Sequence, residues 1–157
     1  MNKEETPDNP GVIAFPPALY AGTLLLGLVF SFIFPMAFLP RVAALIFGII
    51  TAICAALLAF SAFRTMNRAQ TGINPSLPTT TIVSDGIFGF SRKPIYLSLT
   101  LLYVGIALIF NAFWALLLLL PLLLVVQNGI IKREEIYLER KFGAEYSSYK
   151  TRARRWI

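Results

Sequence analysis

Two charged clusters in the second half of the chain contain side chains that could bind a charged ligand. Arg92 and Lys93 lie directly before Pro94, and Lys132-Arg133-Glu134-Glu135 follows a long apolar segment. Two cations and the N–H groups at a helix N-terminus can hold a carboxylate or a phosphate, so the first cluster predicts an anion site. Its alternative role is to fix the orientation of the chain in a membrane.

Glu135 is the most unusual of these residues. On a helix that continues past Ile131, it shares an otherwise apolar face with Leu138 and Phe142. That face is expected to pack on the rest of the protein, and a buried carboxylate needs a partner. We expect the partner to be the Arg92-Lys93 pair or polar groups of a ligand. A purely structural ion pair with Arg92 is the alternative.

Three neighbouring polar residues have two interpretations each. Glu134 lies about 100° round the same helix, beside Ile130 and Tyr137, and either joins the site or faces solvent. Tyr146 and Tyr149 either close over the anion site or anchor the chain at the membrane interface.

The element that must bring the two clusters together is the segment Ile95 to Ile131, which contains no charged residue. One helical crossing of a hydrocarbon layer takes roughly 20 residues, and this segment is about twice that length. It should therefore cross the membrane, turn near Asn111 and return. The predicted helices are 94–110 and 113–131, and both charged clusters then lie at one membrane surface.

The whole chain has the composition of an integral membrane protein. It is 57% hydrophobic, with a mean hydropathy of +0.69, well above a soluble domain. We predict an all-α fold with about four transmembrane helices, a C-terminal helical hairpin and an amphipathic exit helix stopped at Gly143. The first two crossings are expected at 18–34 and 42–63. As one membrane domain, 1–157, it divides into a polar tail (1–15), two helices (16–63), a cytoplasmic loop (64–93) and the hairpin with its C-terminal helix (94–157).

Charge placement predicts the orientation and excludes several functions. With four crossings, Arg41 is the one basic residue on the outer side, so both termini and the long loop should be cytoplasmic. The basic residues flank membrane segments, so the net charge of +6 predicts no nucleic-acid partner. Because histidine is absent, a Ser-His-Asp relay and a histidine-bound metal are excluded, and no metal site is expected.

Three segments, in this order and spacing, resemble the isoprenylcysteine carboxyl methyltransferase family. They are Gly86 to Leu97, Glu134 to Leu138 and Phe142 to Tyr149. The wider group includes phospholipid N-methyltransferases. The resemblance covers about residues 62–157 and is closest to bacterial members, which favours a bacterial inner membrane.

This resemblance implies a membrane enzyme that uses S-adenosylmethionine and methylates a lipophilic acceptor arriving from the bilayer. Carried over by position, Arg92 and Arg133 would orient an anionic acceptor, and Glu135 would act in catalysis. The residues implied in cofactor binding are Lys93, Pro94, Tyr96, Leu97, Glu134, Glu135 and Tyr146.

Two positions depart from the family pattern. The usual Arg-His-Pro is Arg92-Lys93-Pro94 here, and Ser98 replaces a common glycine. Lysine is a flexible point charge rather than a planar ring, so cofactor affinity or substrate type could differ. The first two helices resemble nothing that we can name, which leaves the acceptor open.

The predicted function is an S-adenosylmethionine-dependent methyltransferase acting on a carboxylate or an amine of a lipid-like or isoprenoid-like molecule. Its partners would be membrane lipid and the acceptor, and the oligomeric state is left open. One alternative is a non-catalytic scaffold, which predicts Glu135 satisfied by protein groups and no cavity beside it. Another is a sterol-reductase-like oxidoreductase, although no dinucleotide-binding motif is present.

Overall fold

The computed structural model describes residues 8, 10–72 and 78–157 of the chain. The described residues contain helices and connecting loops and no β-strand, which confirms the all-α prediction. The elements are α1 (Pro16–Ile33), α2 (Arg41–Arg68), the 3₁₀ turn η1 (Gly86–Gly89), α3 (Pro94–Ile109), α4 (Phe113–Val126), the π-helical turn η2 (Gln127–Ile131), α5 (Lys132–Phe142) and α6 (Ala144–Arg152).

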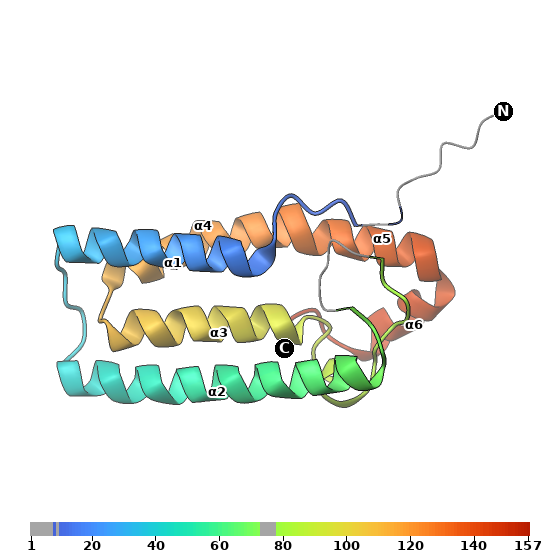
Figure 1. Ribbon diagram of the computed structural model, residues 1–157, viewed down its shortest axis with the longest axis horizontal. Coiled ribbons are helices and arrows are strands. Elements are labelled where there is room, and N and C mark those ends of the chain that lie inside the picture. The colour runs from blue at the N-terminus through green and yellow to red at the C-terminus, as the bar shows by residue number, and fades with distance from the viewer. Residues whose placement is uncertain (1–7, 9, 73–77) are drawn as a thin grey trace.

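Three described helices are long and apolar enough to cross a membrane: α1, α2 and the continuous helix Phe113–Phe142. The fourth apolar helix, α3, has 16 residues and packs along α2, while α1 packs along α4 (Figure 1). Large apolar side chains such as Phe32, Val42 and Phe60 remain exposed on the bundle surface. Lipid is the environment that covers such a surface, so the protein is an integral membrane protein.

Small residues let the paired helices approach closely. A Cβ atom added at Gly48 of α2 would lie 2.7 Å from the backbone nitrogen of Ile109, and one at Gly105 of α3 would lie 2.9 Å from the nitrogen of Ala52. A Cβ atom added at Gly27 of α1 would lie 2.5 Å from the Cα of Ala115 in α4. These contacts fix the spacing of the bundle that carries the polar residues at its end.

The turn between α3 and α4 lies at Asn111, as predicted. Its φ of +51° is in the left-handed region that asparagine tolerates. The Asn111 side chain donates to the carbonyl of Leu39 at 2.7 Å and accepts from the Leu39 N–H at 3.3 Å. The hairpin turn is thereby tied to the α1–α2 connection.

Two predicted boundaries are wrong. The second helix does not stop at Phe63 but continues to Arg68, so the following loop is shorter than 64–93. The reason is that a helix can continue into water after its apolar part ends, and Arg64 and Arg68 remain helical there. The second wrong boundary is the end of the helix predicted at 113–131: α4 ends at Val126 and the π-helical turn η2 follows it, within a helix that is continuous to Phe142. That helix ends before Gly143 as expected, where φ is +52°.

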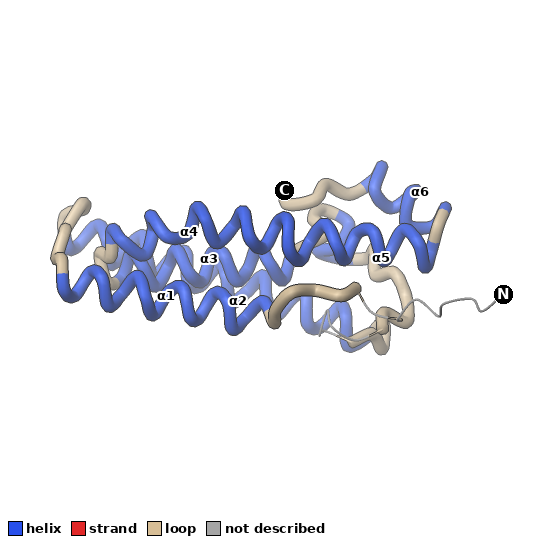
Figure 2. Tube along the Cα trace, turned by 90° about the horizontal axis from the view of Figure 1, so that it is seen from above, coloured by secondary structure: helices blue, strands red, loops and turns tan. Residues whose placement is uncertain are grey.

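Most non-helical residues gather at one end of the bundle. Seen from above (Figure 2), α6 lies beside α5 at this end of the bundle, and the C-terminal residues turn back toward the bundle. The segment before α1, residues 10–15, runs along the side of α4 and α5 at this end (Figure 1). We call residues 10–15 the N-terminal strap.

Candidate active site

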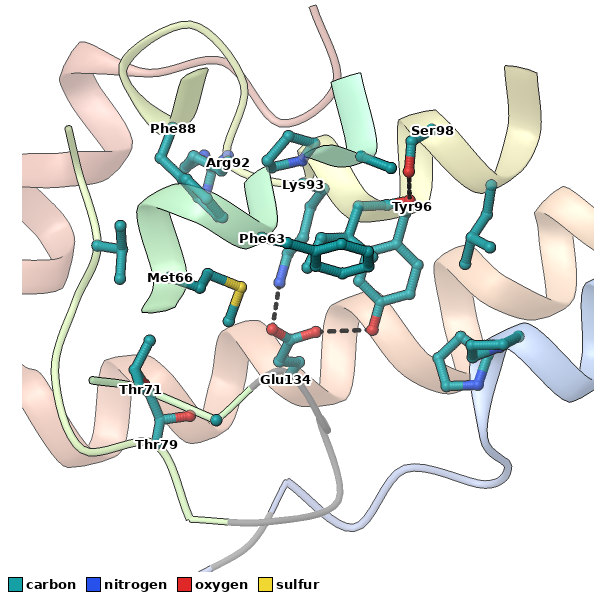
Figure 3. A pocket seen from close by; sticks show the side chains of 18 of the residues that line it. Phe63, Met66, Thr71, Thr79, Phe88, Arg92, Lys93, Tyr96, Ser98 and Glu134 are labelled. Carbon is teal, nitrogen blue, oxygen red and sulfur yellow. Dashed lines mark hydrogen bonds and ion pairs between the residues drawn. The ribbon is translucent and has the colours of Figure 1, made fainter. Parts of the chain in front are cut away.

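The helical hairpin brings the two charged clusters together, as the apolar segment predicted. Lys93 Nζ lies 2.7 Å from Glu134 Oε1, and the hydroxyl of Tyr96 donates to Glu134 Oε2 at 3.0 Å (Figure 3). Lys93 precedes α3 and its side chain is 4% exposed, whereas Glu134 on α5 is 19% exposed. A buried polar group needs a partner, and Glu134 supplies it.

Glu135, the adjacent residue, is held by two arginines. Arg92 Nη1 lies 3.2 Å from its Oε1, and Arg155 contacts both oxygens, with Nε at 2.9 Å from Oε1 and Nη2 at 2.7 Å from Oε2. This two-point geometry is the one that suits a guanidinium and a carboxylate. The hydrogen bond to Glu135 also raises the pKa of Arg155. Burial and ion pairing of Glu135 are therefore confirmed, and both oxygens accept from protein groups.

Residues 153–157, which we call the C-terminal clamp, complete this arrangement. The N–H of Arg92 donates to the carbonyl of Arg154 at 2.8 Å, beside an isolated bridge between Ser91 and Arg154. Trp156 Nε1 donates to Gln127 Oε1 at 3.2 Å. The clamp thus joins the start of α3 to the π-helical turn, and sequence reasoning missed it, because its arginines look like ordinary membrane-flanking charges.

The cavity at this end of the bundle has a volume of about 560 Å³, within the range of small-molecule sites. Its charged wall contains Arg92, Lys93 and Glu134. Its apolar walls come from the strap, α1, α2 and α3. Among those lining residues are Phe15, Pro16, Pro17, Ala55, Ala56, Ala59, Phe63, Met66, Ile95, Leu99 and Leu102.

The position of Glu134 corrects one of the two interpretations made from sequence. Glu134 and Leu138, one helical turn apart, both line the cavity, so the solvent-facing alternative for Glu134 is wrong. Glu135 does not line the cavity and points instead to Arg155. The π-helical turn directly before α5 shifts the helical register, which a regular helix pattern does not anticipate.

Two tyrosines of α6 form part of the cavity wall. Tyr146 accepts a hydrogen bond from Arg92 Nη1 at 3.4 Å, and burial raises the pKa of Tyr146 to about 12. Tyr149 donates to the carbonyl of Phe88 at 2.7 Å. Both side chains therefore stay neutral at physiological pH, and they connect α6 to the segment leading into α3.

A second polar cluster lies where the strap and a neighbouring loop meet α5. The hydroxyl of Tyr137 donates to Asp8 Oδ1 at 2.7 Å and accepts from Lys141 Nζ at 3.0 Å and from the N–H of Thr79 at 3.3 Å. Arg133 Nη1 donates to the carbonyl of Gly11 at 3.0 Å. The strap and the loop that contains Thr79 are thus both fastened to α5.

The predicted site residues separate into two groups. Those that line the cavity are Arg92, Lys93, Pro94, Tyr96, Glu134 and Tyr146. Leu97, Arg133 and Glu135 do not line it. The roles assigned to all of them from sequence stay predictions. The small residues of α2 and Thr71 also line the cavity and were not singled out, because an Ala-rich helix face looks the same whether it packs or leaves space.

Together these elements define a membrane-embedded helical domain with a charged pocket at one end. The model of the phospholipid methyltransferase family matches residues 43–145. A Haemophilus influenzae protein described as uncharacterized is 44% identical over 62 residues, which is 40% of this chain and 98% of that protein. No solved structure matches the chain.

The chain belongs to the phospholipid methyltransferase family, which lies in one superfamily with the isoprenylcysteine carboxyl methyltransferases. Members of this family are membrane methyltransferases that use S-adenosylmethionine. The predicted family resemblance is therefore confirmed, although the match begins at residue 43 and includes α2, which was expected to lie outside it. The oxidoreductase alternative loses its support.

Proposed function

We propose that this chain transfers a methyl group from S-adenosylmethionine to a lipophilic acceptor. The observation that carries the proposal is the buried Lys93–Glu134–Tyr96 group on the wall of a largely apolar cavity. Family membership supplies the class of chemistry. The cavity supplies what that chemistry needs, because methyl transfer depends on alignment and on exclusion of water more than on acid–base groups.

The residues present fit the methyl donor. When bound, S-adenosylmethionine would supply a methyl group on a positively charged sulfur. Glu134 places a carboxylate on the cavity wall, where negative charge favours a cationic ligand. Lys93 and Tyr96 hold that carboxylate in one orientation, and Lys93 does so where family members usually have histidine.

The apolar part of the cavity is suited to the acceptor's hydrocarbon portion. Ala55, Ala56 and Ala59 leave space along α2 that larger side chains would fill. A carboxylate acceptor arrives already ionised and needs no base. An amine acceptor must lose a proton, and Glu134 is the carboxylate on the wall that could receive it.

Other predicted residues are proposed to act indirectly. Glu135 positions Arg92, which lines the cavity, and Arg133 fastens the strap, whose Phe15 also lines it. We also propose an inner-membrane location with both termini cytoplasmic, because the basic residues flank the end of the bundle that holds the site.

The scaffold alternative deserves a direct test because one of its expectations is met: Glu135 is satisfied by protein groups. The scaffold alternative does not predict a cavity at this end of the bundle, and one is present. Purified protein should be titrated calorimetrically with S-adenosylmethionine and its demethylated product, in detergent and in nanodiscs. We expect both compounds to bind. We expect Glu134→Gln to lower the affinity for S-adenosylmethionine at least tenfold.

Glu139→Gln is the matched control. Its carboxylate lies on the same helix, is 41% exposed and pairs with Lys150 at the surface, so binding should stay unchanged. Absence of binding by the wild-type protein in every lipid condition would support the scaffold. If the wild-type protein does bind S-adenosylmethionine, transfer of its radiolabelled methyl group to a component of a total lipid extract would identify the acceptor.

A further inference from the structure

The C-terminal clamp and the residue before its bridge to Ser91 present several exposed side chains at one end of the apolar helices. Phe90 is 78% exposed and Ile157 is 79% exposed. Arg154 is exposed as well, and Trp156 is half-buried. The bridge between Ser91 and Arg154 places Phe90 beside the clamp. We call Phe90, Arg154, Trp156 and Ile157 the clamp patch.

One hydrogen bond fixes the position of the clamp patch along the bundle. Trp156 Nε1 donates to Gln127 Oε1 at 3.2 Å, and Gln127 lies five residues before Lys132, where the uncharged segment ends. Five helical residues span about 7.5 Å. The interfacial layer on each side of a bilayer is about 5–8 Å thick. The clamp, which turns back toward the bundle (Figure 2), therefore reaches into this layer.

The two consecutive arginines of the clamp have different surroundings. Arg155 holds the buried carboxylate of Glu135. The Arg154 side chain is exposed and forms no ion pair or hydrogen bond with the described part of the chain. Consecutive side chains of an extended segment point in opposite directions, so Arg154 points away from the protein where Arg155 points into it. An unpaired cation at the level of the headgroups is complementary to an anionic lipid.

We propose that the clamp patch is a docking surface for the headgroup of an anionic phospholipid. Arg154 binds the lipid phosphate, and Phe90 and Ile157 lie among the adjoining acyl chains. Trp156 suits this position, because tryptophan is enriched where a membrane meets water. The proposal goes beyond methyl transfer, and it holds whether or not the cavity binds S-adenosylmethionine.

A lipid bound at this surface stabilises the start of α3. The N–H of Arg92 donates to the carbonyl of Arg154 at 2.8 Å, so the same residue that binds the headgroup also holds the residue that lines the cavity. Opening of the clamp breaks this bond and withdraws Arg154 from the headgroup. A lipid that binds only the closed clamp shifts the equilibrium toward it. The composition of the leaflet is thereby coupled to the order of the site.

The backbone N–H of Arg92 is the reporter for the test, because its hydrogen bond closes the clamp. Its hydrogen exchange is measured by NMR on the full chain in nanodiscs of dioleoyl phosphatidylcholine, with and without dioleoyl phosphatidylglycerol. We expect exchange to be about fivefold slower with the anionic lipid, the factor that corresponds to the attraction of one basic residue to an anionic surface. High salt should reduce the difference.

Substitutions of Arg154 test whether its charge carries the effect. Arg154→Gln keeps the backbone carbonyl and should abolish the difference between the two nanodiscs, whereas Arg154→Lys should retain it. Arg140→Gln is the matched control. It removes the same charge from α5, eight residues past Lys132 and therefore about 12 Å farther along the helix from the apolar segment. The difference should persist in this variant.

A second measurement tests the depth of the clamp patch without changing it. Trp114→Phe leaves Trp156 as the single tryptophan of the chain. Its fluorescence is recorded in nanodiscs of phosphatidylcholine that is brominated either near the headgroup or near the methyl end of the acyl chains. We expect stronger quenching by the bromine near the headgroup.

Four results would overturn the docking surface. They are equal exchange at Arg92 in the two nanodiscs, equal effects of Arg154→Gln and Arg140→Gln, absence of Trp156 quenching by either brominated lipid, and dissociation of a dimer by Phe90→Ser. The last result would assign the patch to a contact between two copies of the chain.

Discussion

The contact between Arg155 and Glu135 permits a quantitative prediction about how the site is held together. Arg155→Ala removes two charge-assisted hydrogen bonds, at 2.9 and 2.7 Å, from a carboxylate that is 7% exposed. Glu135 Oε2 then loses its protein donor. The contact of Oε1 with Arg92 at 3.2 Å remains.

The magnitude follows from burial on each side of the pair. Hydrogen bonds to charged groups contribute about 1.5–3 kcal/mol each, and leaving a buried charge wholly unpaired costs about 3–5 kcal/mol. The Arg155 side chain is 38% exposed, so water replaces part of the interaction, and Arg92 keeps Glu135 paired. We therefore expect a loss of about 1–2 kcal/mol in the free energy of unfolding, seen as a Tm several degrees lower.

The assay is thermal unfolding in detergent, combined with a double-mutant cycle using Glu135→Gln. A coupling energy of about 1 kcal/mol between the two positions is expected, because they are in direct contact. Arg152→Ala is the matched control, since that exposed arginine of α6 bonds its own helix at Ser148. Equal Tm values for Arg155→Ala and Arg152→Ala would refute the clamp as a stabilising element.

Three further outcomes are expected at other positions. Tyr137→Phe removes the hydroxyl that accepts from the N–H of Thr79, so hydrogen exchange at Thr79 should become several-fold faster while that of α3 stays constant. The hydrogen bond from Lys141 lowers the pKa of Asp8, so this contact stabilises the attachment of Asp8 to α5 above the ordinary aspartate pKa and is lost as the pH falls through the lowered value. The NMR chemical shift of the Asp8 carboxyl should therefore be constant from about pH 7 to 5 and change below about pH 4; a change near neutral pH would implicate another group. Gly48→Ala should lower Tm by several degrees, because its Cβ would lie 2.7 Å from backbone, whereas Gly22→Ala, in open space, should not.

The global arrangement could be predicted from the sequence because its signals are strong. A long uncharged segment between two charged clusters leaves few solutions in lipid, and Asn111 marks the turn. Helix ends were less predictable. The end of the apolar stretch near Phe63 says where the membrane segment ends, but the backbone continues as a helix to Arg68.

The assignment of the two glutamates could not be predicted in full. Glu135 was expected to be buried and paired, which is correct, but Glu134 is the carboxylate that lines the cavity. The difference depends on the π-helical turn at Gln127–Ile131, for which Gly129 and its polar neighbours are a weak signal. Arg155 was hidden among many basic residues, because charge alone does not distinguish a side chain that holds a carboxylate from one that faces lipid headgroups.

The C-terminal clamp gives synthesis of this protein a late checkpoint. The described helices all precede Arg154, Arg155 and Trp156 in the chain, so they are synthesised first. A chain interrupted after α6 would contain these helices yet lack the groups that contact Glu135 and the start of α3. Such a product would insert and then be a preferred substrate for membrane quality-control proteases, which act on marginally stable states.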